Sequence, residues 1–148
     1  MLRLEIITVD GTVFDDNVNM VIAPGSDGVL GVLPRHTPLM TTLTYGELEI
    51  KKEGQPDQFF AIGGGFMEVR PHHVTILADS AERAEEIDLE RAKAARERAE
   101  TMLDESSDKK QDFARAEAAL QRSITRLKVA RRRRNNNDRQ TPSDFDLS

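Results

Sequence analysis

The sequence of 148 residues has no cysteine, no tryptophan and a single tyrosine. The lack of cysteine excludes disulfide bonds and thiolate metal sites. No apolar run approaches the about 18 residues of a membrane-spanning helix, and residues 1–9 are too short and too alternating for a signal peptide. His36, His72 and His73 lack the spacing to carboxylates that favours a metal centre. We therefore expect a soluble intracellular protein that reaches a membrane only through a partner.

Catalytic motifs are also missing. The sequence has no Walker A pattern, no Gly-x-Ser-x-Gly and no paired-carboxylate motif. Gly63-Gly64-Gly65 lies between strand-like runs, without a following helix or a lysine, so we interpret it as a turn or bulge rather than a phosphate loop. We expect His36 to be a loop or surface residue, because no partner nucleophile is evident. The chain is predicted not to be an enzyme on its own.

Charge is distributed unevenly along the chain. Residues 1–80 hold 5 basic and 11 acidic residues, residues 81–134 hold 15 and 12, and residues 135–148 hold 1 and 3. The net charges of -6, +3 and -2 sum to the -5 of the whole chain. A nucleic-acid-binding domain usually interleaves aromatic residues with its basic ones, whereas most phenylalanines here lie in the acidic part. A nucleic-acid partner is therefore not expected.

Residues 1–80 predict a small all-β domain. Apolar and polar residues alternate over residues 2–6, and Asp10-Gly11 is a favoured hairpin turn. Further strand-like runs are separated by turn signals at Pro34, Tyr45-Gly46, residues 54–56, residues 63–65 and Pro71. Short strands at this spacing are typical of a β-sandwich or flattened barrel.

Residues 81–134 predict an antiparallel helical hairpin. Asp88 is an N-cap residue type, residues 106–108 interrupt the helical pattern, and Asp108 with Gln111 has the form of a capping box. The expected apolar stripe of the first helix is Ala92, Ala95, Ala99 and Met102. That of the second helix is Phe113, Ala116, Leu120, Ile124 and Leu127. Because alanine buries little surface but favours helix, we interpret the hairpin as an element that can change partners; a static hairpin is the alternative.

A basic stripe runs along the second predicted helix. Arg115, Arg122, Arg126 and Arg133 follow one another at spacings of 7, 4 and 7 residues. On a helix they lie about 200° away from Phe113 and its apolar stripe. A stripe opposite the packing face suits an acidic surface, a polyanion or only solvent.

The runs GSDGVLGVLPRHTPLMTTLTYGELEI, AIGGGFMEV and VTILADSAERAEEID carry a family resemblance. In order, spacing and length, the chain from about Leu2 to Ala130 resembles the ε subunit of the F-type ATP synthase. The resemblance implies an α+β fold, with a sandwich of about ten strands followed by a two-helix hairpin. It also implies a non-catalytic rotor subunit of the central stalk that couples proton translocation to ATP synthesis and inhibits ATP hydrolysis.

The same resemblance implies partners and a place in the cell. The sandwich would bind the γ subunit and the c-ring, and the extended hairpin would meet an acidic loop of the β subunit. The chain would be peripheral at the cytoplasmic face of the bacterial plasma membrane, without inserting into it. The candidate partner-binding residues are Gly28, Val29, Leu30, Gly31, Arg35, His36, Arg115 and Arg133.

A regulatory nucleotide is implied as well. Residues 87–92 match the I-D-x-x-R-A motif of ε subunits that bind ATP, although no cofactor is required. By resemblance the ATP-contacting residues are Glu82, Ile87, Asp88, Arg91, Ala92, Arg98, Arg122 and Arg126. The alternatives are an N-cap role for Asp88 and helical ion pairs for Arg91 and Arg98.

No role is predicted for the end of the chain, and two other functions are alternatives to the ε subunit. Residues 135–148 lack periodicity and are expected to be disordered, and neither they nor Arg131–Arg134 have an assigned role. The runner-up functions are a free-standing ATP-sensing binding protein and a coiled-coil adaptor with a β-domain head.

Overall fold

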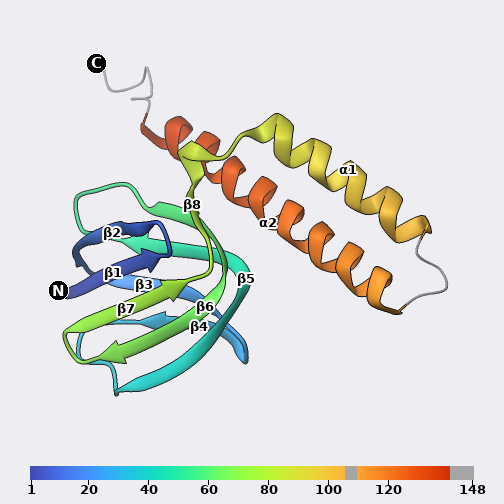
Figure 1. The fold of residues 1–148 in the computed structure, drawn as a ribbon. Coiled ribbons are helices and arrows are strands. Elements are labelled where there is room, and N and C mark those ends of the chain that lie inside the picture. The colour runs from blue at the N-terminus through green and yellow to red at the C-terminus, as the bar shows by residue number, and fades with distance from the viewer. Residues whose placement is uncertain (106–109, 141–148) are drawn as a thin grey trace, which may run out of the picture.

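The computed structural model describes residues 1–105 and 110–140, with side chains of the second range described up to residue 132. The strands are β1 (Leu2–Thr8), β2 (Gly11–Val18), β3 (Met20–Gly25), β4 (Gly28–Val32), β5 (Leu39–Lys51), β6 (Gln58–Arg70), β7 (His73–Ala78) and β8 (Ala81–Arg83). A short 3-10 helix, η1 (Ala84–Glu86), then leads into α1 (Leu89–Glu105) and α2 (Lys110–Gln140). The predicted β domain followed by a helical hairpin is confirmed (Figure 1).

The strands form one curled sheet in the order β2-β1-β7-β6-β5-β3-β4, with β8 paired to β6. β1 and β7 are parallel, and the other pairs are antiparallel. The described residues contain eight strands, where the resemblance implied about ten. The difference lies at Tyr45-Gly46 and Gly63–Gly65, which do not interrupt β5 and β6, so each of these runs continues as a single strand of 13 residues.

Gly63–Gly65 forms an irregularity inside β6, beside the gap between β7 and β8. The backbone N–H of Gly63 donates to Ser80 O at 2.9 Å, and that of Asp79 donates to Gly64 O at 3.0 Å. Gly64 and Gly65 have φ angles of 95° and 132°, and a Cβ on Gly65 would overlap the carbonyl oxygen of Leu77. The glycines permit this close backbone approach, so the triplet is structural.

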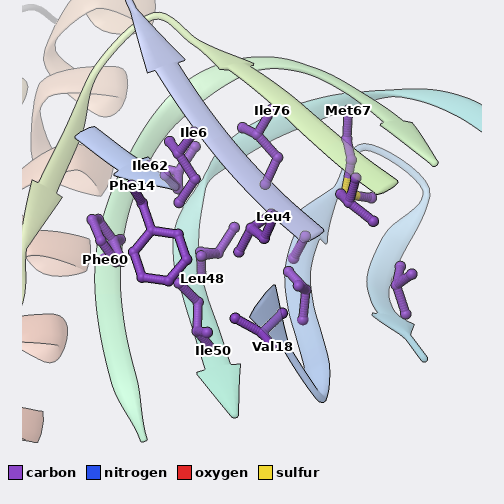
Figure 2. Packing of buried hydrophobic residues seen from close by; sticks show 14 of the residues in the cluster. Leu4, Ile6, Phe14, Val18, Leu48, Ile50, Phe60, Ile62, Met67 and Ile76 are labelled. Atoms are coloured by element: carbon purple, nitrogen blue, oxygen red, sulfur yellow. The ribbon is translucent and has the colours of Figure 1, made fainter. Parts of the chain in front are cut away.

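The core of the sandwich lies between the curled parts of the sheet (Figure 2). Leu4, Ile6, Leu48 and Ile76 are fully buried there, as strand alternation predicts. Phe14 and Phe60 meet edge to face, with ring centroids 6.0 Å apart. All residues of this core belong to the sandwich, and none belongs to the hairpin.

The hairpin lies folded against the sandwich through α2, with α1 on the outer side of α2 (Figure 1). A second buried cluster joins the two parts and consists of Phe59, Ala61, Ala84, Ile87, Ala92, Leu127, Val129 and Ala130. The predicted stripes are therefore only partly right. Met102 of α1 is about half exposed. Phe113 and Ile124 of α2 are also about half exposed, because α2 is buried by two partners, α1 and the sandwich, rather than by α1 alone.

The second helix is longer than predicted. It continues to Gln140, so residues 135–140 are helical where disorder was expected. No proline or glycine occurs between Lys110 and Gln140, and Pro142 is the first residue that disfavours further helix. The predicted interruption at residues 106–108, the capping box at Asp108 and the tail from residue 141 lie outside the described residues.

Candidate functional site

A cavity of about 350 Å³ lies where the hairpin meets the sandwich. Its sandwich side comes from β5, β6 and the approach to β8, and its other walls come from α1 and α2. The lining residues are Tyr45, Ala61, Ile62, Gly63, Ser80, Glu82, Ala95, Arg98, Ala99, Met102, Ala119, Arg122, Ser123, Thr125 and Arg126. The cavity therefore exists only when the hairpin is folded against the sandwich, because its walls come from both parts.

The small residues of the helical seam explain why there is a hollow at this place. Ala95 and Ala99 of α1 face Ala119 and Ser123 of α2 across the cavity. Side chains this small cannot fill the space between two helices and a sheet. Ser123 is buried and satisfies its hydroxyl by donating to the carbonyl of Ala119 at 2.9 Å, so it adds no unpaired group. The alanine-rich sequence therefore creates room for a ligand.

The charged side chains that line the cavity are three arginines and Glu82. Arg126 Nη2 donates to Glu82 Oε2 at 3.1 Å, and Arg126 Nε lies 2.9 Å from Glu82 Oε1. The guanidinium of Arg122 lies over the ring of Tyr45, 5.5 Å from its centroid. Arg98 and Arg122 form no ion pair with a described residue. Two unpaired guanidinium groups beside a third that has one carboxylate favour an anion, above all phosphate oxygens.

The predicted nucleotide residues fall into two groups. Glu82, Arg98, Arg122 and Arg126 line the cavity. The motif at residues 87–92 does not line it, because Ile87 and Ala92 are buried in the cluster between the hairpin and the sandwich.

The remaining two residues of that motif lie at the start of α1. Asp88 caps the helix, accepting the backbone N–H of Arg91 at its Oδ1 over 3.1 Å, and the Arg91 side chain is exposed. The N-cap alternative for Asp88 is therefore what the structure has. The alternative of ion pairs for Arg91 and Arg98 is not found among the described residues, where α1 pairs Lys93 with Glu90 and Arg96 with Glu100.

The predicted basic stripe does not lie wholly opposite the packing face. Arg122 and Arg126 line the cavity beside the sandwich; Arg126 is half-buried there, whereas Arg122 and Arg115 are exposed. The angle from Phe113 misled the prediction, because Phe113 itself is not on the buried side of α2. The side chain of Arg133 lies outside the described residues.

Sequence reasoning missed Tyr45, Ser80, Ser123 and Thr125 as lining residues. Tyr45 was interpreted only as part of a turn signal, yet it lies in β5 directly opposite Gly63. A side chain on Gly63 would crowd the Tyr45 ring, since its Cβ would lie 3.2 Å from Cε1. In the sequence, the feature that could have pointed to this contact was that the chain has a single tyrosine and one glycine triplet.

Six of the eight predicted partner-binding residues lie at the end of the sheet formed by β3, β4 and the start of β5, whereas Arg115 and Arg133 lie in α2. Gly28 opens β4 with a φ of 130°, and Val29 is 78 % exposed. Leu30 is half-buried against the core, and Gly31 is exposed. In the β4–β5 loop Arg35 has a φ of 67°, and its backbone N–H donates to Pro71 O at 2.7 Å. His36 Nδ1 lies 2.7 Å from the carbonyl of Thr37.

An exposed apolar patch on the sheet was not predicted. Met40, Phe66 and Leu77 are 69 %, 56 % and 52 % exposed. Phe66 lies opposite Leu77 on β7 and Thr42 on β5, and Met40 is two residues from Thr42, so the three share the outer face of neighbouring strands. Large apolar residues gathered in this way mark an interaction surface.

Comparison with known proteins gives the family. Residues 1–84 match the family description "ATP synthase, Delta/Epsilon chain, beta-sandwich domain", and residues 85–131 match "ATP synthase, Delta/Epsilon chain, long alpha-helix domain". The chain belongs to the ATP synthase delta/epsilon chain family. The boundary between the two family domains falls in η1, where the structure passes from sheet to hairpin.

Curated members of this family resemble the chain over most of its length. A protein named ATP synthase epsilon chain from Herpetosiphon aurantiacus is 53 % identical over 135 residues, covering 90 % of this chain and 97 % of that protein. One of the same name from Desulforamulus reducens is 48 % identical over 130 residues, covering 86 % and 96 %. The resemblance to the ε subunit made from the sequence is therefore confirmed.

Solved structures of two ATP synthases contain chains that are similar to this one. A chain of the Euglena gracilis mitochondrial ATP synthase matches with a TM-score of 0.75 and 27 % identity, covering 84 % of this chain and 78 % of that one. A chain of the Tetrahymena thermophila enzyme, from its central stalk and c-ring, matches in fold with a TM-score of 0.51 and 12 % identity. Within the described residues no helix has the length and apolarity to span a bilayer, and no three metal-ligating side chains gather.

Proposed function

We propose that this chain is the ε subunit of a rotary ATP synthase, a non-catalytic part of the central stalk that couples proton translocation to ATP synthesis. The observation that carries this proposal is the match of both family domains over residues 1–131, in the order and with the boundary that the fold has. Curated relatives of about half identical sequence carry the name ATP synthase epsilon chain. A place at the cytoplasmic face of the bacterial plasma membrane, held there by partner subunits, follows from the proposal.

The sandwich is the docking part of this subunit. Its apolar patch at Met40, Phe66 and Leu77 suits the γ subunit, because a permanent interface buries apolar surface. The exposed strand β4 with Val29, together with the loop around His36, suits the c-ring.

Co-purification tests the docking proposal. The native complex should contain this chain together with a γ subunit, and Phe66→Asp with Leu77→Asp should release the chain from it. Val9→Asp, at a residue that is 92 % exposed outside the patch, is the matched control and should be retained. A wild-type chain that purifies alone from native membranes would instead support the free-standing ATP sensor.

The hairpin is the regulatory part. We assign the cavity to ATP, with its phosphates held by Arg98, Arg122 and Arg126. Support comes from the convergence of these arginines on one cavity that exists only when α1, α2 and the sandwich are together. A ligand that binds only this folded form at 100 times its dissociation constant stabilises it by about 2.7 kcal/mol. When ATP is scarce, the hairpin extends toward the acidic loop of the β subunit and restrains hydrolysis.

Calorimetry of the isolated chain tests the nucleotide assignment. ATP should bind the wild-type chain at millimolar concentration or tighter, and Arg122→Ala and Arg126→Ala should each weaken binding at least tenfold, the usual weight of a charged hydrogen bond. Lys128→Ala is the control, because Lys128 is an exposed cation of α2 that does not line the cavity. If the wild-type chain shows no binding, or if Lys128→Ala weakens binding as much as the arginine variants, the assignment is wrong.

A further inference from the structure

A second contact between α2 and the sandwich lies beyond the cavity. Arg132 Nε donates to Glu47 Oε2 and Arg132 Nη2 donates to Glu47 Oε1, both at 3.1 Å, which is the parallel fork of a bidentate pair. The same guanidinium lies over the ring of Phe59, 5.3 Å from its centroid. Neither Arg132 nor Glu47 lines the cavity. This contact is therefore separate from the proposed nucleotide site.

The surroundings make this pair stronger than an ordinary surface ion pair. The side chain of Glu47 is only 13 % exposed, so losing Arg132 would leave a poorly solvated carboxylate. Phe59 belongs to the buried cluster under Leu127, Val129 and Ala130, which fixes the ring on which the guanidinium rests.

The contact keeps the guanidinium of Arg132 in its charged form. The hydrogen bond that Arg132 donates to Glu47 raises the pKa of Arg132 above its already high ordinary value. A raised folded-state pKa contributes stability at pH values below the unfolded value, as long as Glu47 is ionised.

We infer that Arg132, Glu47 and Phe59 form a clasp that holds the hairpin folded on the sandwich without any nucleotide. The inference depends on the folded arrangement of the hairpin and not on the cavity binding ATP. Arg132 is the residue directly after the part of the chain that matches the helical-domain description, so family membership does not imply the clasp.

The clasp and a ligand in the cavity both favour the folded hairpin over the extended one, and they contact α2 at different positions. A phosphate bound in the cavity would compete with Glu82 for Arg126, whereas Arg132 pairs with a different carboxylate, that of Glu47. The clasp therefore sets how often the hairpin lifts in the absence of ligand, and a ligand adds to it. Extension of the hairpin requires breaking the fork at Glu47 and exposing Phe59.

The absence of cysteine allows a direct measurement of lifting in the full chain. Ala84 is 1 % exposed in the cluster under α2, so the thiol of Ala84→Cys reacts with a labelling reagent only when the hairpin lifts. Without nucleotide, Arg132→Gln should increase the labelling rate of this thiol about tenfold, which corresponds to about 1.4 kcal/mol. Arg131→Gln is the matched control, because Arg131 is the exposed neighbour, and it should leave the rate unchanged.

A second thiol separates lifting from unfolding. Ala23 is fully buried in the sandwich core, and the labelling of Ala23→Cys should be the same with and without Arg132→Gln. The clasp is disproved if Arg132→Gln labels at the rate of Arg131→Gln, or if Ala23→Cys accelerates as much as Ala84→Cys. Added ATP should slow the labelling of Ala84→Cys; if it does not while Arg132→Gln still accelerates it, the nucleotide assignment fails and the clasp stands.

Discussion

Arg122 and Arg126 line the same cavity but are held by different partners. Arg126 is held by the carboxylate of Glu82, whereas Arg122 rests on the ring of Tyr45 and has no carboxylate among the described residues. A phosphate group entering the cavity meets Arg122 already oriented and must compete for Arg126. The aromatic ring thus orients a cation without neutralising it.

Replacing Tyr45 tests this orienting role. A cation–π contact at a partly exposed site contributes about 0.5–1 kcal/mol, so Tyr45→Leu should weaken ATP binding roughly 2- to 5-fold. Tyr45→Phe keeps the ring face and should bind as the wild-type chain does. Calorimetry measures the ATP affinity of the wild-type chain and of both variants. If Tyr45→Leu binds ATP as tightly as the wild-type chain, the ring has no orienting role.

Gly65 is the residue whose replacement should damage the sandwich most directly. Its φ of 132° and the overlap of an added Cβ with the Leu77 carbonyl predict that Gly65→Ala destabilises the fold by about 2 kcal/mol or more. Gly54 also has a positive φ, of 77°, but open space around it, so Gly54→Ala should cost about 1–2 kcal/mol from the backbone alone. Urea unfolding compares the two, and equal losses would show that the close approach at Gly65 is unimportant.

At the scale of elements, α2 buries one side on α1 and another on the sandwich. The seam with α1 uses small residues, so it leaves the cavity, and the contact with the sandwich uses Leu127, Val129 and Ala130. The helix is thus attached firmly near residues 127–132 and loosely in its earlier turns, where Phe113 and Ile124 are half exposed.

Filling the cavity separates its role from that of the helices themselves. Ala119→Leu adds a side chain at the cavity wall and should reduce ATP affinity at least tenfold, because it occupies space that a ligand needs. Ala114→Leu, at an exposed position of the same helix, should bind ATP normally. Both variants should keep the helical signal in circular dichroism. Unchanged ATP affinity in Ala119→Leu would place the nucleotide elsewhere.

The sequence predicted elements better than their packing. Alternation and helical periodicity in the sequence predicted the sandwich and the hairpin. The predicted stripe through Phe113 and Ile124 assumed that α2 has one buried face. In the structure α2 contacts both α1 and the sandwich, so it has two buried faces. Tyr45-Gly46 and Gly63–Gly65 have turn composition and yet lie within β5 and β6, because each remains paired with the neighbouring long strand. Four of the eight predicted nucleotide residues line the cavity, and Tyr45 was missed because contacts between β5 and α2 leave no local pattern.

The sandwich has its own core, and within residues 1–105 and 110–132 the hairpin is attached to it by one cluster and two ion pairs. None of the residues of the sandwich core belongs to the hairpin. We therefore propose that the sandwich is fixed in the complex and that the hairpin is a movable arm attached to it. In this proposal the folded hairpin is stabilised by the clasp at Arg132 and by ATP in the cavity, and the extended hairpin restrains hydrolysis.

ATP hydrolysis by the purified synthase complex shows whether the extended hairpin restrains the enzyme. The complex containing the full chain should be compared with one in which the chain ends after Ile87, just before α1. We predict that the shortened chain still assembles and that its complex hydrolyses ATP faster, with the largest difference at low ATP concentration, where the arm is extended. Equal hydrolysis rates for the two assembled complexes at every ATP concentration would contradict the account.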